Sequence, residues 1–465
     1  MKRRALFFTA LALFLAAARL CHSKILWAEE ALPLAAALQV KAGLFLYRDF
    51  WFDKPPLLPL FHLLAGGLDG WPLRLLGAAH ALAACALAFA AARLRWSERE
   101  GYQAAAAMAF FLTFDTASSA IPVAADALMI VPHLAAIWLT WKRKPFAAGL
   151  IAGIAFLCNS KGLFVAAACL IWNWRAFPAL AAGFAIPNIA ALMVLWSQDA
   201  LLPYYDQVWK WGRVYAGVTF VAEPLKNGTI RTANWLGFHA ALVLAAGAFW
   251  LRDRAGDGVK WAGWAAVSIV AVGLGWRFFP RYFFQLLPLL TLAAARGYSL
   301  AGPRLRIAIL LAALVPMARF GPRYATLAAG DNTWADTAMD RDSREAAALV
   351  KSMAEPGDSL LVWGFRPEIY VYTGLRAGTR FLDSQPLTGV PADRHLTQST
   401  PLTPELARSN RRQLAGSAPS FLVDGLGSYN PSLSIAAFED LRPWLQNYRV
   451  AGKSGFSTIW RRRAD

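Results

Sequence analysis

Residues 2–20 of the chain read KRRALFFTALALFLAAARL, a basic tripeptide followed by an apolar run of the length that a membrane-spanning helix needs. Arg19 interrupts the small residues at the end of this run and makes a poor signal-peptidase site, so we expect an uncleaved first span. Similar apolar stretches of about 17–22 residues recur as far as residue 320, more than a soluble protein could bury. The pattern predicts a polytopic α-helical membrane protein.

The composition indicates the same class of protein. Of the 465 residues, 57% are hydrophobic and 16% are charged, whereas about a quarter of a soluble chain is charged. The net charge of +18 would suggest nucleic acid as a partner of a soluble protein. Here Lys and Arg gather in short clusters between apolar segments, as orientation signals do, and we expect no nucleic acid. The four cysteines show no metal-ligand spacing.

The basic clusters alternate with the apolar segments in a way that predicts about eleven transmembrane helices. The N-terminus with Lys2-Arg3-Arg4 is expected in the cytoplasm of a bacterium, and the protein in its inner membrane. A last span at about 305–320 would leave the C-terminal third in the periplasm. The other residues assigned to the cytoplasmic side are Arg93, Arg95, Arg99, Lys142, Arg143, Lys144, Arg175, Arg252, Arg254, Lys260, Arg296, Arg304 and Arg306.

Two domains are expected. Residues 1–325 would form the membrane domain, with a first outer loop at about 23–56, and residues 330–465 a small α/β domain outside the membrane. The second domain is indicated by a change of composition and by short apolar runs bounded by Gly, Pro and Asp. Its predicted elements are a helix at Asp340–Met353, strands at Ser359–Trp363 and Ser420–Val423, and a hairpin within Tyr448–Trp460.

The predicted topology places nine ionisable residues at the outer ends of spans or in outer loops. Each of them alone could be a solvated loop charge. Ionisable groups at membrane depth are costly and usually mark function, so nine from four separate loops predict one polar cleft at the outer interface. These residues are Glu29, Glu30, Asp49, Asp53, Lys54, Asp126, Lys161, Arg277 and Arg281.

The first outer loop carries the densest motif, with Glu29-Glu30, then Gly43, then YRDFWFDKPP at 47–56. It resembles the first periplasmic loop of the bacterial protein-mannosyltransferase-like group, glycosyltransferase family 39. That group belongs to the GT-C superfamily and has the lipid A aminoarabinose transferase among its relatives. Three later segments fit the same pattern in order, so that the resemblance covers roughly residues 1–320. They are Ala125-Asp126-Ala127, Ser160-Lys161-Gly162, and Arg277 through Arg281-Tyr282 to Gln285-Leu286-Leu287-Pro288.

The resemblance implies a GT-C-like fold and an inverting glycosyltransferase. Such an enzyme moves a sugar from a polyprenyl-phosphate carrier to the hydroxyl of a lipid, glycan or protein acceptor among the membrane lipids. Glu29 and Glu30 are the implied catalytic residues, with Glu29 as general base. The family usually has Asp-Glu here, and many members have His where this chain has Arg281. The implied substrate-binding residues are Asp53, Lys54, Asp126, Lys161, Arg277, Arg281 and Tyr282, of which the three cations Lys161, Arg277 and Arg281 would hold the donor phosphate.

Other functions remain open from the residues alone. A transporter or flippase of a lipid-linked or polar solute could line its pathway with the outer charges, although transporters tend to show paired halves and interrupted helices at the membrane midplane. A non-catalytic partner in envelope assembly would use the C-terminal domain to bind another protein. Whether the protein uses a divalent cation also stays open, because some GT-C enzymes use one and others do not.

Overall fold

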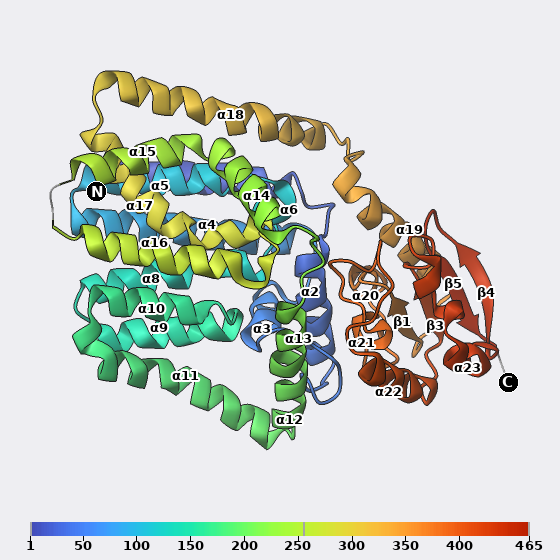
Figure 1. Ribbon diagram of the computed structural model, residues 1–465. Helices are drawn as coiled ribbons and strands as arrows, with labels where there is room; N and C mark the ends of the chain where they lie inside the picture. Colours follow the sequence, from blue (N-terminus) through green and yellow to red (C-terminus); the bar gives the residue numbers. More distant parts are fainter. Residues whose placement is uncertain (1, 254–255, 464–465) are drawn as a thin grey trace.

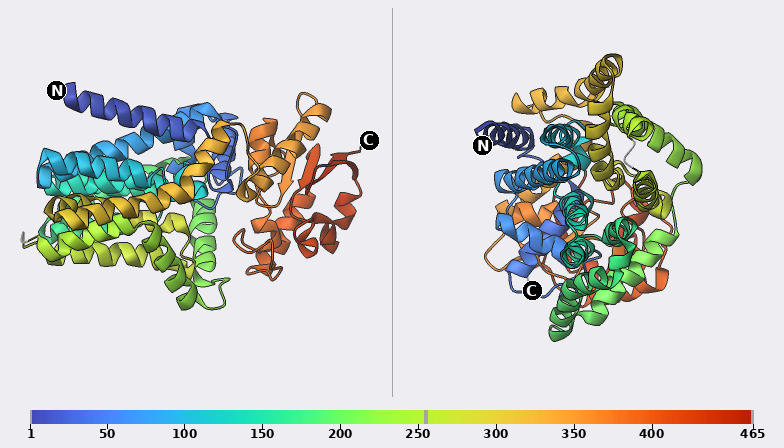
Figure 2. Two further views of the ribbon diagram at one scale, coloured as in Figure 1. Left: turned by 90° about the horizontal axis from the view of Figure 1, so that it is seen from above. Right: turned by 90° about the vertical axis from the view of Figure 1, so that its left-hand side faces the viewer.

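The protein is a bundle of helices with a small α/β unit at one end (Figure 1). The computed structural model describes residues 2–253 and 256–463, so that Arg254, one of the predicted cytoplasmic residues, lies outside the described residues. The helices of the bundle run roughly parallel to one long direction, and the right-hand view of Figure 2 looks along it. The C-terminal unit lies beyond one end of the bundle, as the left-hand view shows.

Four helical segments are long and apolar enough to cross a membrane, and a fifth is added if α14 and α15, bent by 88° against each other, form one span. The prediction of eleven spans is neither met nor excluded by this test, because the other apolar segments form shorter or more charged helices. The four segments are α4 (Trp71–Arg95), η2 with α11 (Trp174–Ser197), α16 with η4 (Gly258–Trp276) and α18 (Pro303–Ala328). The other long helices are α1 (Lys2–Leu20), α5 (Glu98–Phe111), α8 (Ile130–Trp141), α9 (Pro145–Cys158), α10 (Gly162–Trp172), α14 (Pro224–Phe238), α15 (Ala240–Arg252) and α17 (Leu287–Leu300).

Glycines bring helices of the bundle into backbone contact. A Cβ added to Gly149 of α9 would lie 2.1 Å from the carbonyl oxygen of Leu180 in α11, and one added to Gly297 of α17 would lie 1.8 Å from that of Ala245 in α15. No side chain fits at such distances. Close approach at small residues is typical of helix packing in membranes, where the hydrophobic effect does not drive helices together.

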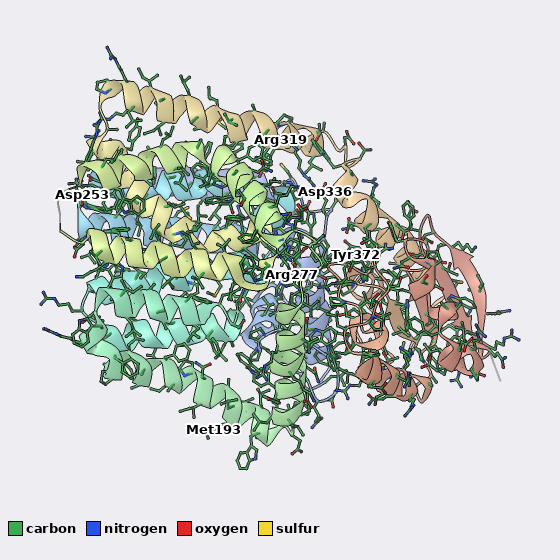
Figure 3. The ribbon with its side chains drawn as sticks, in the orientation of Figure 1. Met193, Asp253, Arg277, Arg319, Asp336 and Tyr372 are labelled. Atoms are coloured by element: carbon green, nitrogen blue, oxygen red, sulfur yellow. The ribbon has the colours of Figure 1, made fainter. Side chains whose placement is uncertain are left out.

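The two ends of the bundle differ. At the end away from the C-terminal unit, Arg95 pairs with Asp257, and Arg296 Nε lies 3.3 Å from Asp253, which Figure 3 labels there. Predicted cytoplasmic residues from distant segments thus gather at one end. The other end holds α2 (Ala28–Lys41) and a set of short elements, which are α3 (Leu57–His62), α6 (Ala117–Ala120), α7 (Ala125–Leu128), α12 (Leu201–Tyr204), η3 (Tyr205–Lys210), α13 (Trp211–Gly217) and η5 (Pro280–Gln285).

The C-terminal unit contains a five-stranded sheet with the strand order β2-β1-β3-β5-β4. Strand β1 is parallel to both of its neighbours, whereas β5 pairs antiparallel with β3 and β4. The predicted helix, both predicted strands and the hairpin are confirmed, with boundaries shifted by a residue or two. That residues 330–465 form a separate domain stays a proposal. The elements are α19 (Ala338–Met353), β1 (Ser359–Trp363), α20 (Glu368–Thr373), β2 (Arg376–Ala377), α21 (Gln385–Thr388), α22 (Pro404–Ala415), β3 (Phe421–Asp424), α23 (Arg442–Leu445), β4 (Tyr448–Lys453) and β5 (Thr458–Arg462).

Candidate active site

An ion pair between Glu29 and Arg281 forms the centre of the candidate site. Glu29 lies in the first turn of α2, and Arg281 lies in η5, 252 residues further along the chain. The Nη1 atom of Arg281 donates to Oε1 of Glu29 over 2.8 Å, while the two side chains stay 24% and 31% exposed. The carboxylate therefore meets a cation and still reaches solvent, at a helix N-terminus that favours negative charge.

A second ion pair adjoins Arg281. Lys161 Nζ donates to Oδ1 of Asp126 over 3.3 Å, and Arg281 Nε lies 3.7 Å from the other carboxylate oxygen. Lys161 Nζ also lies 3.3 Å from the centre of the Tyr282 ring, a cation–π contact. Burial lowers the pKa of Lys161 despite the charge of Asp126. Glu29, Asp126, Lys161 and Arg281, called the ion cluster below, thus come from four segments far apart in the sequence.

Asp53 and Lys54 form a further pair at the end of the first outer loop. Lys54 Nζ donates to Asp53 Oδ2 over 2.9 Å, and the other oxygen of Asp53 is buried without a hydrogen-bond partner among the described residues. Burial and the charge of Asp53 raise the pKa of Asp383, in the C-terminal unit, to about 7. No motif surrounds Asp383 in the sequence, so only the folded chain reveals that a carboxyl group of the C-terminal unit interacts with the charge of Asp53.

Glu30 points away from the ion cluster and is enclosed. Arg74 of α4 donates to both carboxylate oxygens, over 3.0 and 2.5 Å, and the backbone N–H of Val123 donates to Oε2 over 2.9 Å. The side chains of Arg74 and Glu30 are 1% and 0% exposed. Adjacent residues of a helix point in directions about 100° apart, so Glu29 and Glu30 separate into a partly exposed and a buried carboxylate. This geometry favours a positioning role for Glu30 over the predicted catalytic one.

Arg277 and Asp49, two further predicted outer charges, also lie outside the ion cluster. Arg277 is buried and donates to Asp393 of the C-terminal unit over 2.6 Å, and its Nη2 atom to the carbonyl oxygens of Tyr215 and Val218 over 2.6 and 3.0 Å. Figure 3 shows it at the junction with that unit. This arrangement favours a structural role over the predicted phosphate contact. Asp49 accepts hydrogen bonds from its neighbours in the loop, the Phe45 N–H and the Arg48 side chain.

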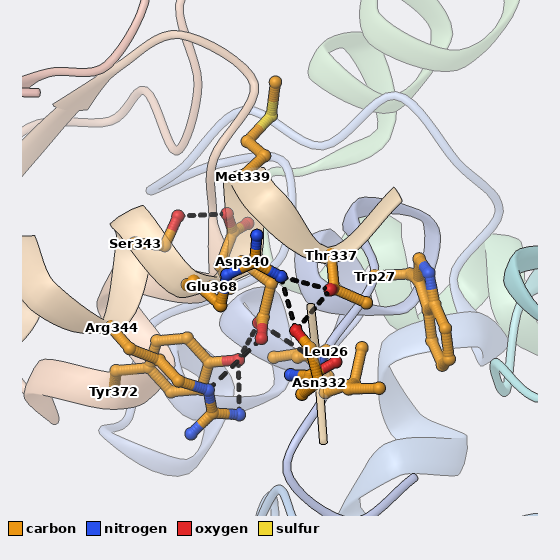
Figure 4. A network of polar contacts seen from close by, with 12 residues as sticks. Leu26, Trp27, Asn332, Thr337, Met339, Asp340, Ser343, Arg344, Glu368 and Tyr372 are labelled. Atoms are coloured by element: carbon orange, nitrogen blue, oxygen red, sulfur yellow. Dashed lines mark hydrogen bonds and ion pairs between the residues drawn. The ribbon is translucent and has the colours of Figure 1, made fainter. Parts of the chain in front are cut away.

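The C-terminal unit is fixed to the first outer loop close to Glu29. The backbone N–H of Leu26 donates to Oδ1 of Asp340 over 3.1 Å. Asp340 also accepts the Tyr372 hydroxyl and lies 3.2 Å from Arg344 Nε, as Figure 4 shows. Because Leu26 precedes Glu29 by three residues, this network helps to set where α2 begins.

No metal ligand set is evident. Across residues 2–253 and 256–463, no group of three or more His, Cys, Asp or Glu side chains could hold a metal ion.

Comparison with known proteins gives matches of structure only. No family model matches the sequence, and no curated protein matches it significantly. Among solved structures, ArnT from Cupriavidus metallidurans bound to undecaprenyl phosphate has a TM-score of 0.64 at 15% identity, over 100% of this chain and 99% of that chain. Its apo state has a TM-score of 0.60 at 13% identity, over 99% and 98%. The apo oligosaccharyltransferase of Archaeoglobus fulgidus has a TM-score of 0.51 at 12% identity, over 96% and 72%.

These matches confirm the resemblance that the sequence motifs indicate, at the level of the fold. ArnT and the oligosaccharyltransferase both belong to the GT-C superfamily. The chain follows the fold of ArnT over its whole length, including the C-terminal unit. At these identities the likeness concerns the fold alone.

Proposed function

We propose that the chain is an inverting glycosyltransferase that moves a sugar from a polyprenyl-phosphate carrier to an acceptor hydroxyl at the outer face of the bacterial inner membrane. The observation that carries the proposal is the ion cluster of Glu29, Asp126, Lys161 and Arg281. It lies at the end of the bundle that faces the C-terminal unit, where a lipid-linked donor would present its phosphate. The ArnT structure with undecaprenyl phosphate, which has the same fold, supports a lipid phosphate as donor.

The charges of the ion cluster suit the reaction in two steps. A donor phosphate competes with the carboxylates for Lys161 and Arg281, and when Arg281 turns to the phosphate, Glu29 is released from its ion pair. Glu29 then accepts the proton of the acceptor hydroxyl, whose oxygen attacks the anomeric carbon as the bond to the carrier phosphate breaks. The two cations stabilise the negative charge on the leaving phosphate.

The remaining residues have supporting roles in this proposal. Asp53, Lys54 and Tyr282 line the donor side, where their polar groups can contact the sugar. Asp126 holds Lys161 and Arg281 in place before the donor arrives. Glu30 acts through Arg74 by fixing the first turn of α2, and so it is a positioning residue.

Arg281→Met and Lys161→Met are each expected to lower kcat/KM for the donor by about 10²–10³-fold, the usual cost of removing one group that stabilises developing charge. The measurement uses the purified protein with a panel of radiolabelled polyprenyl-phosphate sugars, followed as transfer or hydrolysis of the label. Arg319→Met is the matched control, because Arg319 is exposed near the outer end of α18. Donor kinetics like those of the wild type in both variants would reduce Lys161 and Arg281 to membrane anchors.

The proposed orientation predicts that an enzyme reporter fused after residue 330 is active only outside the cytoplasm. The basis is the gathering of basic residues at the end of the bundle opposite the C-terminal unit, since Lys and Arg favour the cytoplasmic side. A paired fusion after Lys144 should show the opposite preference. Cytoplasmic activity of the fusion after residue 330 would place the ion cluster on the wrong face for this reaction.

A further inference from the structure

A groove separate from the ion cluster lies between two parts of the protein. One side is the helical stretch from α12 to α13, and the other side is the C-terminal unit. The volume of the groove is about 370 Å³. The bundle side contributes a short helical stretch that contains a π-helical segment, η3. The residues of the lining that matter below are Trp51, Leu202, Asp206, Lys210, Arg380 and Thr403.

Two buried polar atoms of this lining lack a partner. Among the described residues, neither Nε of Arg380 nor Oγ1 of Thr403 has a hydrogen-bond partner. Leaving a buried donor unpaired costs free energy, which a ligand with acceptor oxygens would recover. Lys210 adds an exposed cation, and Asp206, whose carboxylate lies 3.7 Å from it, offsets one charge. The groove therefore carries a net charge of about +1 and favours an anion.

The position of the groove points to a lipid as the source of that anion. The membrane-spanning segment η2–α11 ends at Ser197, and α12 begins at Leu201. The side chain of Leu202 in the lining is 70% exposed. Much of the apolar outer end of α11, which precedes Leu202 in the chain, is exposed as well. An amphiphile can place its chains against these apolar side chains and its headgroup beside Arg380.

We propose that this groove binds the anionic headgroup of a membrane phospholipid and thereby ties the C-terminal unit to the lipid surface. Arg380 is suited to transmit the effect, because its carbonyl oxygen accepts the backbone N–H of Trp51 over 2.6 Å. A lipid that orders Arg380 would thus also order the first outer loop. The lining of the groove includes none of the four residues of the ion cluster.

The test measures binding by native mass spectrometry of the full chain in a neutral detergent. Dioctanoyl phosphatidylglycerol is expected to bind about tenfold or more tightly than dioctanoylglycerol, which has the same chains and no phosphate. Millimolar inorganic phosphate is expected not to displace it. Equal affinities for the two lipids, or displacement by inorganic phosphate, would overturn the proposal.

Three variants place the effect at the groove. Arg380→Met and Lys210→Met should each reduce the preference for the phospholipid several-fold, whereas Arg408→Met, an exposed position of α22 outside the lining, should keep it. Arg380 also donates to the carbonyl oxygen of Tyr47 over 3.4 Å, so its replacement could disturb folding. The exposed Lys210 avoids this problem, and an unchanged preference in Lys210→Met contradicts the site. Donor turnover does not enter the test, so its outcome is independent of the proposed reaction.

Discussion

Glu29→Gln is expected to lower turnover by about 10²–10⁴-fold, the usual contribution of a general base, while donor binding is largely kept. Glutamine has the size of glutamate and can accept a hydrogen bond from Arg281, but it cannot take the proton of an acceptor hydroxyl. The thermal stability should change little, because Glu29 is partly exposed and its partner Arg281 also lies near Asp126. Single-turnover kinetics with a labelled donor would separate the chemical step from binding.

Two further variants sharpen this result. Glu29→Asp should keep part of the activity, since it restores the residue usual in the family that the first outer loop resembles, at the cost of one methylene of reach. Asp49→Asn is the control from the same loop, because Asp49 bonds only to neighbouring residues of the loop in the described structure. Normal turnover of Glu29→Gln would mean that this loop does not provide the base.

The sequence predicted the members of the ion cluster because each of them belongs to a short motif at the end of an apolar segment. Four such segments end at the same side of the bundle, so that Glu29, Asp126, Lys161 and Arg281 meet when the helices pack. Strand β1 and helix α19 were likewise predictable, since their periodicity and flanking residues are local. The number of spans stays a prediction, because half-length helices and a strongly bent pair blur the relation between hydropathy and crossing.

The sequence could not predict in which direction a side chain points or with which residue it pairs. Glu30 and Arg277 belong to the same motifs as the cluster, yet both point into packed regions and meet Arg74 and Asp393 there. Arg74 and Asp393 carry no motif, and only tertiary packing brings them to their partners. An arginine at the start of an apolar span, as Arg74 is, does indicate from the sequence that a partner of opposite charge lies nearby, because a buried charge needs one. The sequence does not show which residue that partner is.

Glu30→Gln is expected to destabilise the protein by about 3–5 kcal/mol, because it leaves the Arg74 guanidinium buried without its counter-charge. The loss would appear as a lower midpoint of thermal or denaturant unfolding in detergent. Glu345→Gln, at an exposed position of α19, should change the midpoint little. The folded fraction of Glu30→Gln should turn over far faster than Glu29→Gln, since Glu30 does not reach the substrate.

The combination of Glu30→Leu with Arg74→Met decides between a positioning and a catalytic role for Glu30. Replacing both members of a buried ion pair by apolar residues is often neutral for stability, whereas removing one member is not. The double variant should therefore recover much of the stability that either single variant loses. Turnover should recover together with stability. One part of it should stay lost, because the double variant lacks the hydrogen bond from the Val123 N–H to Glu30, which holds the segment before Asp126. Restored stability with no turnover would instead make Glu30 a catalytic residue and place the motif one residue further along.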